Sequence, residues 1–555
     1  MGICSSTPST GVPILDQIHR VHAKSDGKNA IIESGPQVDK PLAVSYKELI
    51  TNAEAVAKVL QGLLNSQGPD KPRHVGYLVN PSIAYVVMEL AVWTTGACCV
   101  PLSVHSPAPE LKYFLEDSDA LVVVADEAMD SKLKPVAQEL GRVYAVIAKT
   151  GEATKYELKP APGCDTKEGG KVAANLDSNA LMLYTSGTTG KPKGVVHTFK
   201  SLTATYTSLS EAWKWSNKDQ TLHVLPLHHI HGVQNILNTA LYNGATVEFT
   251  PFDAAFCLKR LGSGDITCFH AVPTVYTKFT QHLDKASEEE RKAVESGLRN
   301  DKMRYMVSGS AALPVPTMAS WAKISGHVLL ERYGMTEIGM ALSNRIDDTR
   351  YPGCVGWALP QVEAKLDTDG GILVKGGPVF KEYYKKEEAT KKEFTEDGWF
   401  KTGDAGQCTW SEEEVQKMQV SAKEVDEATG RPSGKIADNP PEEVKTIFKI
   451  MGRSSIDIIK SGGYKISGLE IESVLLQHPK ITECAVIGKK DATWGEAVTA
   501  VCVLNGDLDL KELKEWAKDR IATYKVPKHL EVVDKLPRNA MQKIEKTKLI
   551  EKYGA

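Results

Sequence analysis

Short apolar runs alternate with segments of helical periodicity between His74 and Ile147, and this alternation constrains the fold most strongly. Parallel strands need a crossover connection, usually a helix, so this spacing is typical of a parallel sheet covered by helices. We therefore predict an α/β fold. The expected strands are Val75–Val79, Ala97–Leu102, Leu121–Ala125 and Val143–Ile147, and the expected helices are Ala84–Val92, Glu110–Glu116 and Lys132–Leu140.

The pattern changes near Gly452, and the chain is long enough for more than one domain. At roughly 150 residues per domain, 555 residues suffice for about three or four units. Strand patterns at Glu483–Gly488 and Ala497–Leu504 precede an amphipathic helical pattern at Leu510–Ile521, and a further strand is expected at Leu530–Val533. We predict a flexible leader over residues 1–15, a large N-terminal α/β domain with several subdomains over 16–451, and a small mobile α+β domain over 452–555.

A highly charged segment, Ser411–Lys445, precedes this change of pattern. It contains Gly430-Arg431-Pro432-Ser433-Gly434 and Pro440-Pro441, which are residues that interrupt helices and strands. Such a composition favours solvent exposure. Residues 411–445 are therefore predicted to be a surface insertion in the N-terminal domain.

Composition removes several classes of function. A net charge of −3 provides no basic surface for nucleic acid, and no apolar run reaches the ~18–20 residues of a membrane span. The ten cysteines are scattered without a C-x-x-C pair, so zinc-ligand spacing is absent. Reduced, buried thiols in a cytoplasmic protein are expected.

The N-terminus suggests a lipid anchor. Met1-Gly2-Ile3-Cys4-Ser5-Ser6 fits the M-G-x-x-x-[ST] pattern for myristoylation of Gly2, and Cys4 is placed for a second, palmitoyl chain. Two chains anchor a protein stably, whereas one binds a membrane only marginally. The alternative is a short disordered leader that happens to begin Met-Gly. Membrane association through the N-terminus is thus a hypothesis added to a cytoplasmic location.

The segment Tyr184–Gly194, with the sequence YTSGTTGKPKG, follows the apolar run Ala180–Leu183. Its glycines let backbone N–H groups turn toward an anion, its hydroxyls can donate to phosphate oxygens, and its lysines add positive charge. A Walker A loop is excluded, because only two residues separate Gly187 from Gly190 and Pro192 stands where Ser or Thr is required. The segment is predicted to bind phosphate groups.

Further motifs follow this segment along the chain. They are Glu331-Arg332-Tyr333-Gly334-Met335-Thr336-Glu337, Lys401-Thr402-Gly403-Asp404, Gly452-Arg453, Gly462-Gly463-Tyr464-Lys465 and Leu536-Pro537-Arg538-Asn539-Ala540-Met541-Gln542-Lys543. In this order, over about Asp16–Tyr553, the chain resembles the adenylate-forming superfamily, which includes acyl-CoA synthetases, firefly-type luciferases and peptide-synthetase adenylation domains. The resemblance implies that ATP activates a carboxylic acid through an acyl-adenylate.

The resemblance also implies a nucleotide site. The phosphate loop would hold the β- and γ-phosphates, Thr336 would bond the α-phosphate, and Glu337 would ligate Mg²⁺. Asp404 would accept hydrogen bonds from the ribose, with Arg453 nearby, and Tyr333 would stack on adenine. The implied ATP-binding residues are Thr185, Ser186, Gly187, Thr188, Thr189, Gly190, Lys193, Ser310, Ala311, Glu331, Arg332, Tyr333, Gly334, Asp404 and Arg453.

Lys543 resembles the catalytic lysine of the family. It would meet the negative charge that develops when the carboxylate attacks the α-phosphorus, so Lys543, Thr336 and Glu337 are the implied catalytic residues. Gln542 departs from the family, which usually has glycine there. In the family the C-terminal domain rotates between adenylation and thioester formation. By this resemblance Gly462, Gly463, Tyr464 and Lys465 would bind CoA.

The acid pocket is predicted around the sequence Pro226-Leu227-His228-His229-Ile230-His231-Gly232. His229 aligns with the family's gating aromatic position, and a metal site is the alternative for these histidines, although the Pro and Gly flanks disfavour a helix that would present them together. With Ala271–Lys278, Met303–Pro314 and Leu330–Asn344, this segment most closely resembles malonyl-CoA synthetases.

A dicarboxylic acid needs a cation for its second carboxylate, because an unpaired buried charge is costly. Arg304 is the predicted clamp, with a structural salt bridge at a strand start as its alternative, and His231 and Met340 would line the rest. The expected reaction is malonate + ATP + CoA giving malonyl-CoA, AMP and pyrophosphate. Ligation of methylmalonate, acetate or a fatty acid, and a catalytically silent binding protein, are the alternatives.

Overall fold

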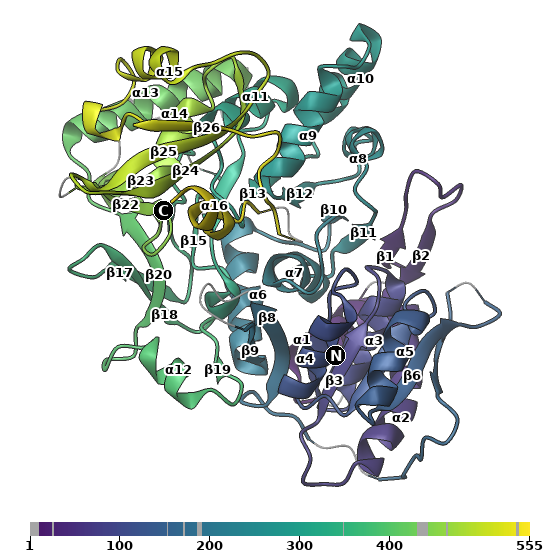
Figure 1. Ribbon diagram of the computed structural model, residues 1–555. Coiled ribbons are helices and arrows are strands. Elements are labelled where there is room, and N and C mark those ends of the chain that lie inside the picture. Colours follow the sequence, from purple (N-terminus) through teal and green to yellow (C-terminus); the bar gives the residue numbers. More distant parts are fainter. Residues whose placement is uncertain are drawn as a thin grey trace.

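The computed structural model describes residues 10–24, 27–152, 154–169, 173–185, 191–347, 349–429, 442–461, 464–539 and 543–554. Gly2, Cys4, the phosphate-loop residues Ser186, Gly187, Thr188, Thr189 and Gly190, the pair Gly462 and Gly463, and Gln542 lie outside these residues. The α/β fold is confirmed, with a large N-terminal part and a smaller C-terminal part (Figure 1). In the described part of the chain, no helix has both the length and the apolar character of a membrane span.

The alternating region forms the centre of one sheet. Among the described residues this sheet has the order β19-β9-β8-β4-β3-β5-β6-β7, and β3 pairs in parallel with β4 and β5. The predicted strands and helices of this region are all present. The strands are β3 (His74–Leu78), β4 (Cys98–Pro101), β5 (Val122–Asp126), β6 (Val143–Lys149), β7 (Tyr156–Pro160), β8 (Asn179–Thr185), β9 (Lys193–Thr198) and β19 (Glu382–Tyr383).

A second large sheet carries the residues after the phosphate loop. Within the described ranges its order is β16-β15-β14-β13-β12-β10-β11-β1-β2, and β10 to β14 are parallel. The strands are β1 (Asn29–Glu33), β2 (Leu42–Ser45), β10 (Gln220–His223), β11 (Thr246–Phe249), β12 (Cys268–Ala271), β13 (Tyr305–Ser308), β14 (Leu330–Tyr333), β15 (Leu342–Ser343) and β16 (Trp357–Ala358).

Helix α3 (Ile83–Thr94) lies between these sheets and is buried from Ile83 to Trp93. A helix that is apolar on all sides needs a core on all sides, and α3 belongs to a cluster with residues of both sheets. Ser82 caps its first turn by accepting from the Tyr85 N–H group. The other helices of the large part are α1 (Pro13–Lys24), α2 (Tyr46–Ser66), α4 (Ala108–Asp117), α5 (Asp130–Glu139), α6 (Phe199–Trp213), η1 (His231–Asn238), α7 (Thr239–Tyr242), α8 (Ala254–Leu261), α9 (Pro273–Leu283), α10 (Glu288–Leu298), α11 (Val315–Ser325), η2 (Thr336–Ile338) and α12 (Glu387–Lys392).

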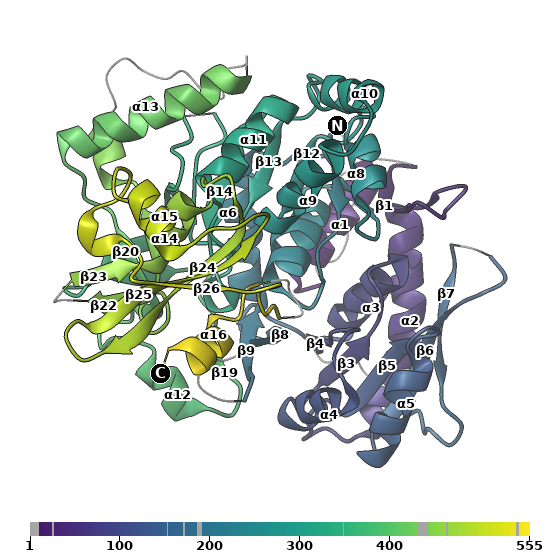
Figure 2. The same ribbon diagram turned by 45° about the horizontal axis from the view of Figure 1, so that its top comes forward.

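Two smaller sheets complete the described chain. One has the order β17-β18-β20-β21, and the other has β23-β22-β25-β24 with β26 beside β25. Both views show α16, in yellow, where the small part meets the large one (Figures 1 and 2). The elements are β17 (Val362–Leu366), β18 (Gly371–Gly376), β20 (Phe400–Gln407), η3 (Glu442–Thr446), β21 (Lys449–Arg453), β22 (Ile458–Ser461), β23 (Tyr464–Ser467), α14 (Gly468–Leu475), β24 (Ile481–Asp491), β25 (Gly495–Leu504), α15 (Leu510–Ala517), η4 (Thr523–Lys525), β26 (His529–Val532) and α16 (Lys546–Tyr553).

The charged segment before β21 includes a long helix, α13 (Glu412–Thr429). Val415, Ala422 and Val425 are buried on one face of it, and α13 packs against α11. Its composition therefore conceals an amphipathic helix, which lies along the outside of the molecule (Figure 2).

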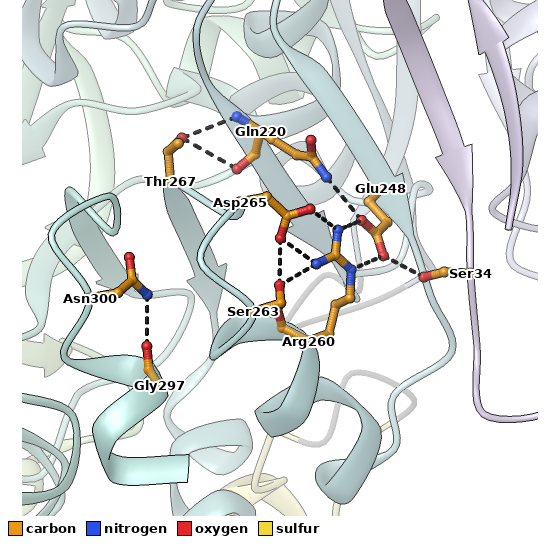
Figure 3. A network of polar contacts seen from close by, with 9 residues as sticks. All are labelled: Ser34, Gln220, Glu248, Arg260, Ser263, Asp265, Thr267, Gly297 and Asn300. Atoms are coloured by element: carbon orange, nitrogen blue, oxygen red, sulfur yellow. Dashed lines mark hydrogen bonds and ion pairs between the residues drawn. The ribbon is translucent and has the colours of Figure 1, made fainter. Parts of the chain in front are cut away.

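A network of polar side chains links β10 and β11 of the second sheet to helix α8. Arg260 donates to both oxygens of the buried Glu248, at 2.7 and 2.6 Å, and also contacts Asp265 (Figure 3). Glu248 accepts further hydrogen bonds from Ser34 and Gln220. A cavity of about 470 Å³ borders this network. Because the buried Glu248 is paired with the Arg260 guanidinium, we interpret the network as structural.

Candidate active site

The candidate site lies at the carboxyl ends of β12, β13 and β14. These three strands are parallel neighbours, and their registers place Ala271 beside Ser308 and Ser308 beside Glu331. Side chains that follow parallel strands converge at this edge of a sheet. The turn Gly309–Ala311 follows β13, and the segment Gly334–Glu337 follows β14. Two separate predicted motifs therefore meet here.

The phosphate loop connects two antiparallel strands. Thr185, at the end of β8, pairs with Lys193, at the start of β9. A Walker A loop instead joins a strand to a helix, so the observed connection agrees with the exclusion made from the sequence. The base of the loop is anchored on α4: Tyr184 Oη donates to Asp117 at 3.0 Å, and Lys191 Nζ lies 5.3 Å from the Tyr113 ring centroid.

Glu337 lies in the short helix η2 and is 5% exposed. Tyr383 Oη donates to its carboxylate at 2.9 Å, and Lys193 Nζ lies 4.0 Å from the Tyr383 ring centroid. Burial raises the pKa of Glu337, while Tyr383 and Lys193 oppose the rise. The preceding Thr336 is fixed through its carbonyl, which accepts from His197 Nε2 at 2.7 Å. Sequence reasoning missed Tyr383 and His197, which no motif contains.

The residues present fit a magnesium ion shared with a nucleotide. Among the described residues, no group of three His, Cys, Asp or Glu side chains is arranged to hold a metal ion. Mg²⁺ is usually held by one or two carboxylates together with substrate phosphates and water. Glu337 offers such a carboxylate, and Lys193 and Thr185 mark the two ends of the phosphate loop near it.

Asp404 and Arg453 face each other across β20 and β21, which pair these two residues in register. Arg453 Nε lies 2.9 Å from Asp404 Oδ1, and Tyr333 Oη donates to Asp404 Oδ2 at 2.6 Å. Burial raises the pKa of Asp404, and the Arg453 guanidinium opposes this rise. The two strands thus hold the Asp404 carboxylate between a phenol and a guanidinium.

Lys543 reaches the same region from the C-terminal part. Its backbone N–H donates to Asn539 Oδ1 at 3.1 Å, and its carbonyl accepts from the Asn539 N–H at 2.9 Å. Burial lowers the pKa of the Lys543 ammonium to about 8, with repulsion from Arg332 and Arg453 and attraction to Asp404. Lys543 therefore lies close to three predicted nucleotide-site residues from the large domain, Arg332, Asp404 and Arg453.

Arg332, which the resemblance assigns to the nucleotide site, lies close to His231, a predicted acid-pocket residue. It is 5% exposed, and its Nη2 donates to Ser310 Oγ at 3.2 Å. Gly309 makes room for it, because a Cβ there would lie 2.3 Å from Arg332 Nε. Ser310, with φ of 66°, also lies 3.0 Å from His231 Nδ1. Within the described residues Arg332 Nε has no hydrogen-bond partner.

His270, which was not predicted, is buried near Arg332 and His231. Its ring centroid lies 6.5 Å from that of His231, and neither of its ring nitrogens has a partner among the described residues. Burial, followed by the charge of Arg332, lowers the pKa of both histidines well below its ordinary value. Neutral imidazoles can still donate one hydrogen bond each. The sequence signal that could have identified His270 is its position directly before Ala271–Lys278, a segment of the predicted acid pocket.

The other predicted acid residues have mixed positions. His229 is half-buried and lies against His228, with ring centroids 4.4 Å apart. Its pKa is lowered by burial first, then by His228 and Lys543. Met340 is 1% exposed and packs in the core that contains α3. Glu331, assigned to the nucleotide site, is buried, and burial raises its pKa to about 8.

Arg304 has to be reassigned. Its Nε and Nη2 each donate to Asp219, both at 2.9 Å, and the Asp219 side chain is 2% exposed. Arg304 directly precedes β13, at the opposite end of the strand from Ser308. A guanidinium already held by a buried carboxylate cannot also clamp a substrate carboxylate at the other end of the strand. The structural salt bridge, the alternative weighed from the sequence, is what the structure contains.

Tyr464 and Lys465, the described members of the predicted CoA segment, begin β23. Lys465 Nζ donates to the Asp369 carbonyl at 3.2 Å, in the turn between β17 and β18. Tyr464 is exposed and stacks on Tyr524 with ring centroids 4.5 Å apart. Lys465 thus contacts a different part of the large domain from Lys543.

Known proteins share both the sequence and the structure of this chain. Residues 19–384 match the AMP-binding enzyme family, and residues 470–543 match the AMP-binding enzyme C-terminal domain. The mitochondrial malonate–CoA ligase of Xenopus laevis is 38% identical over 93% of this chain and 89% of its own length. ATP-bound MatB from Rhodopseudomonas palustris superposes with a TM-score of 0.77 at 30% identity, over 97% of this chain and 98% of that one. A malonyl-CoA ligase with methylmalonyl-CoA and AMP bound has a TM-score of 0.58 at 30% identity, over 96% and 99%.

Proposed function

Because the chain belongs to the AMP-binding enzyme family, we propose that it ligates malonate to CoA with cleavage of ATP to AMP and pyrophosphate. The malonate–CoA ligase of Xenopus laevis and MatB of Rhodopseudomonas palustris support this substrate assignment. The burial of the Arg332 guanidinium is the observation that carries this substrate assignment. A monoacid would leave the buried guanidinium facing an uncharged chain, whereas the second carboxylate of malonate would pair with it.

In the proposed reaction, one malonate carboxylate is held away from the reacting atoms. Arg332 would bind it, with His231 and His270 as neutral donors. An oxygen of the other carboxylate attacks the α-phosphorus of ATP, a P–O bond to that carboxylate forms, and pyrophosphate leaves. The Lys543 ammonium is positioned to stabilise the negative charge that develops on the α-phosphoryl oxygens. Bound Mg²⁺ would neutralise phosphate charge at Glu337.

The second half-reaction transfers the acyl group. The CoA thiolate sulfur attacks the malonyl carbonyl carbon, a C–S bond forms, and AMP leaves with the oxygen that came from malonate. Lys543 lies near Arg332, Arg453 and Asp404, whereas Lys465 contacts the β17–β18 turn. We infer that the domain rotation known in the family separates the two steps, and that the exposed Tyr464–Tyr524 pair contributes to the CoA site.

An acid panel tests the substrate assignment. Acyl-CoA formation is measured with malonate, methylmalonate, succinate, acetate and a medium-chain fatty acid at equal concentrations of ATP and CoA. The highest kcat/KM is expected with malonate, because only a short dicarboxylate satisfies both Arg332 and the reaction centre. A higher value with acetate or the fatty acid would reject the malonate assignment but not the ligase reaction. No acyl-CoA from any acid would favour the catalytically silent alternative.

We also propose that the enzyme is cytoplasmic and that lipid chains on Gly2 and Cys4 hold it at a membrane. The pattern Met1-Gly2-Ile3-Cys4-Ser5-Ser6 supports it. Intact mass of the protein from a eukaryotic host should show added myristoyl and palmitoyl groups, and an unmodified N-terminus would remove the proposal.

A further inference from the structure

Lys546, the first residue of α16, is a buried lysine held between two carboxylates. Its Nζ lies 2.5 Å from Asp457 Oδ1 and 2.6 Å from Glu472 Oε1. Burial alone would lower the pKa of Lys546, yet the two carboxylates raise it above its ordinary value, so the side chain is a cation. This group of three residues is here called the Lys546 triad, and its lysine lies three positions after Lys543 in the sequence.

One carboxylate is sufficient to neutralise Lys546 inside the C-terminal part. Glu472, on α14, also accepts the Val486 N–H at 2.7 Å, so it joins Lys546 to α14 and β24. A second buried carboxylate makes the Lys546 triad net negative, and burial of an excess charge is unfavourable unless further donors satisfy it. Neutralisation of Lys546 therefore does not explain why Asp457 is buried beside it.

The contacts of the second carboxylate oxygen of Asp457 provide that explanation. Asp457 Oδ2 accepts the Arg453 N–H at 2.9 Å, and the Asp457 N–H donates back to the Arg453 carbonyl at 2.8 Å. Arg453 ends β21 and binds Asp404 through its side chain. Asp457 thus contacts the turn that leads from the large domain into the small one, at the residue that carries the nucleotide-site guanidinium.

The other end of the connection is the Lys543 segment. Lys543 and Asn539 exchange hydrogen bonds, and the Glu545 N–H donates to the Pro537 carbonyl at 2.8 Å. Residues 543–546 therefore form a short segment that is fixed at both ends. Asn539 holds it at Lys543, and the Lys546 triad holds it at Lys546. A shift of Lys546 relative to the turn at Arg453 would move Lys543 relative to the nucleotide site.

We propose that Asp457 is a positioning residue for adenylation, which holds the turn after Arg453 and the Lys543 segment together through Lys546. The proposal rests on the adenylation step of the proposed function. It predicts an effect on the half-reaction that uses Lys543 and none on the half-reaction that does not. A purely structural triad would affect both half-reactions alike.

Asp457→Asn tests the proposal, because it removes the charge with little change in volume. Malonate-dependent ATP–pyrophosphate exchange measures adenylation, and single-turnover release of CoA from malonyl-CoA and AMP without pyrophosphate measures the thioester step in reverse. The kcat of exchange is expected to fall about 10- to 100-fold, since displacing a catalytic group by about 1 Å costs up to about 100-fold. The KM values and the CoA release are expected to stay within about threefold.

Asp509→Asn is the matched control. Asp509 also accepts a backbone N–H group in the small domain, from Glu512 at 2.8 Å, but contacts neither Lys546 nor Arg453. This variant should leave both half-reactions unchanged. Equal losses in both half-reactions of a folded Asp457→Asn protein, or undiminished exchange, would overturn the proposal.

If Asp457→Asn shows no cooperative thermal unfolding, Lys546→Arg replaces it. This variant keeps a cation between the carboxylates but moves its charge, so the same selective loss of exchange is expected and an equal loss in both half-reactions again contradicts the proposal. Failure of the malonate assignment is recognised separately, because the wild-type enzyme would then exchange pyrophosphate with another acid of the panel. The variants would be compared with that acid.

Discussion

Lys543→Ala is expected to lower malonate-dependent ATP–pyrophosphate exchange by about 10²- to 10³-fold, which is the cost of removing one preorganised donor from a charged transition state. Lys543 is half-buried beside Arg332, Arg453 and Asp404, and the alanine removes its ammonium group from this set of charges. The measurement is the exchange rate at saturating ATP. CoA release from malonyl-CoA and AMP should be retained, because the thioester step does not use this lysine.

Lys548→Ala is the control for this prediction. Lys548 lies five positions away and is exposed, and among the described residues its ion pair is with Glu545 at 2.6 Å, so its removal should not change the exchange rate. Exchange that survives Lys543→Ala would contradict the assigned role of Lys543. A fall with Lys548→Ala as large as that with Lys543→Ala would show that the effect is not specific to the site.

The same lysine predicts a pH dependence. A lysine is charged below its pKa, and burial with the nearby guanidinium groups lowers the pKa of Lys543 to about 8. The free enzyme therefore loses the required cation as the pH rises through about 8, and kcat/KM for malonate should fall over that range. A constant kcat/KM between pH 7 and about 9.5 would contradict a titrating Lys543.

Arg332→Met is expected to lower kcat/KM for malonate by about 30- to 4,000-fold, which corresponds to the roughly 2–5 kcal/mol lost when a buried charged partner is removed. The methionine cannot pair with the second carboxylate, whereas acetate has no second carboxylate to pair. The ratio of malonate to acetate kcat/KM should therefore fall by most of that factor. Acyl-CoA formation with both acids is the measurement.

Arg304→Lys separates the two arginines. It keeps a cation beside Asp219, so the protein should remain folded and its preference for malonate should not change. A loss of malonate preference in Arg304→Lys, together with its retention in Arg332→Met, would return the clamp to Arg304 and contradict the structural assignment.

The sequence predicted the fold class well because the apolar periodicity is a local signal. Strands β3 to β6 and helices α3 to α5 were each found within a few residues of their expected bounds. The family resemblance was equally reliable, since its motifs are contiguous in sequence. The helix α13 was less visible, because its charged composition dominates the three buried positions Val415, Ala422 and Val425.

Pairings between distant segments were the part that the sequence could not provide. Sequence reasoning assigned Arg304 to the substrate carboxylate and Arg332 to the nucleotide, and the two arginines prove to lie at opposite ends of their strands. Arg304 precedes β13 and meets Asp219 there, whereas Arg332 lies at the carboxyl end of β14 beside Ser310. Three further residues act through contacts that a single sequence does not signal: Tyr383, His197 and Asp457. Their partners lie between four and 139 positions away in the chain.

Transfer of oxygen from malonate to AMP tests the central claim most directly. Malonate labelled with ¹⁸O in its carboxylates is incubated with the enzyme, ATP and CoA, and the products are examined by mass spectrometry. If malonate attacks the α-phosphorus to form an acyl-adenylate, each AMP should carry one ¹⁸O atom, and pyrophosphate should carry none. Label in inorganic phosphate, with ADP as the nucleotide product, would show attack at the γ-phosphorus and would contradict the account.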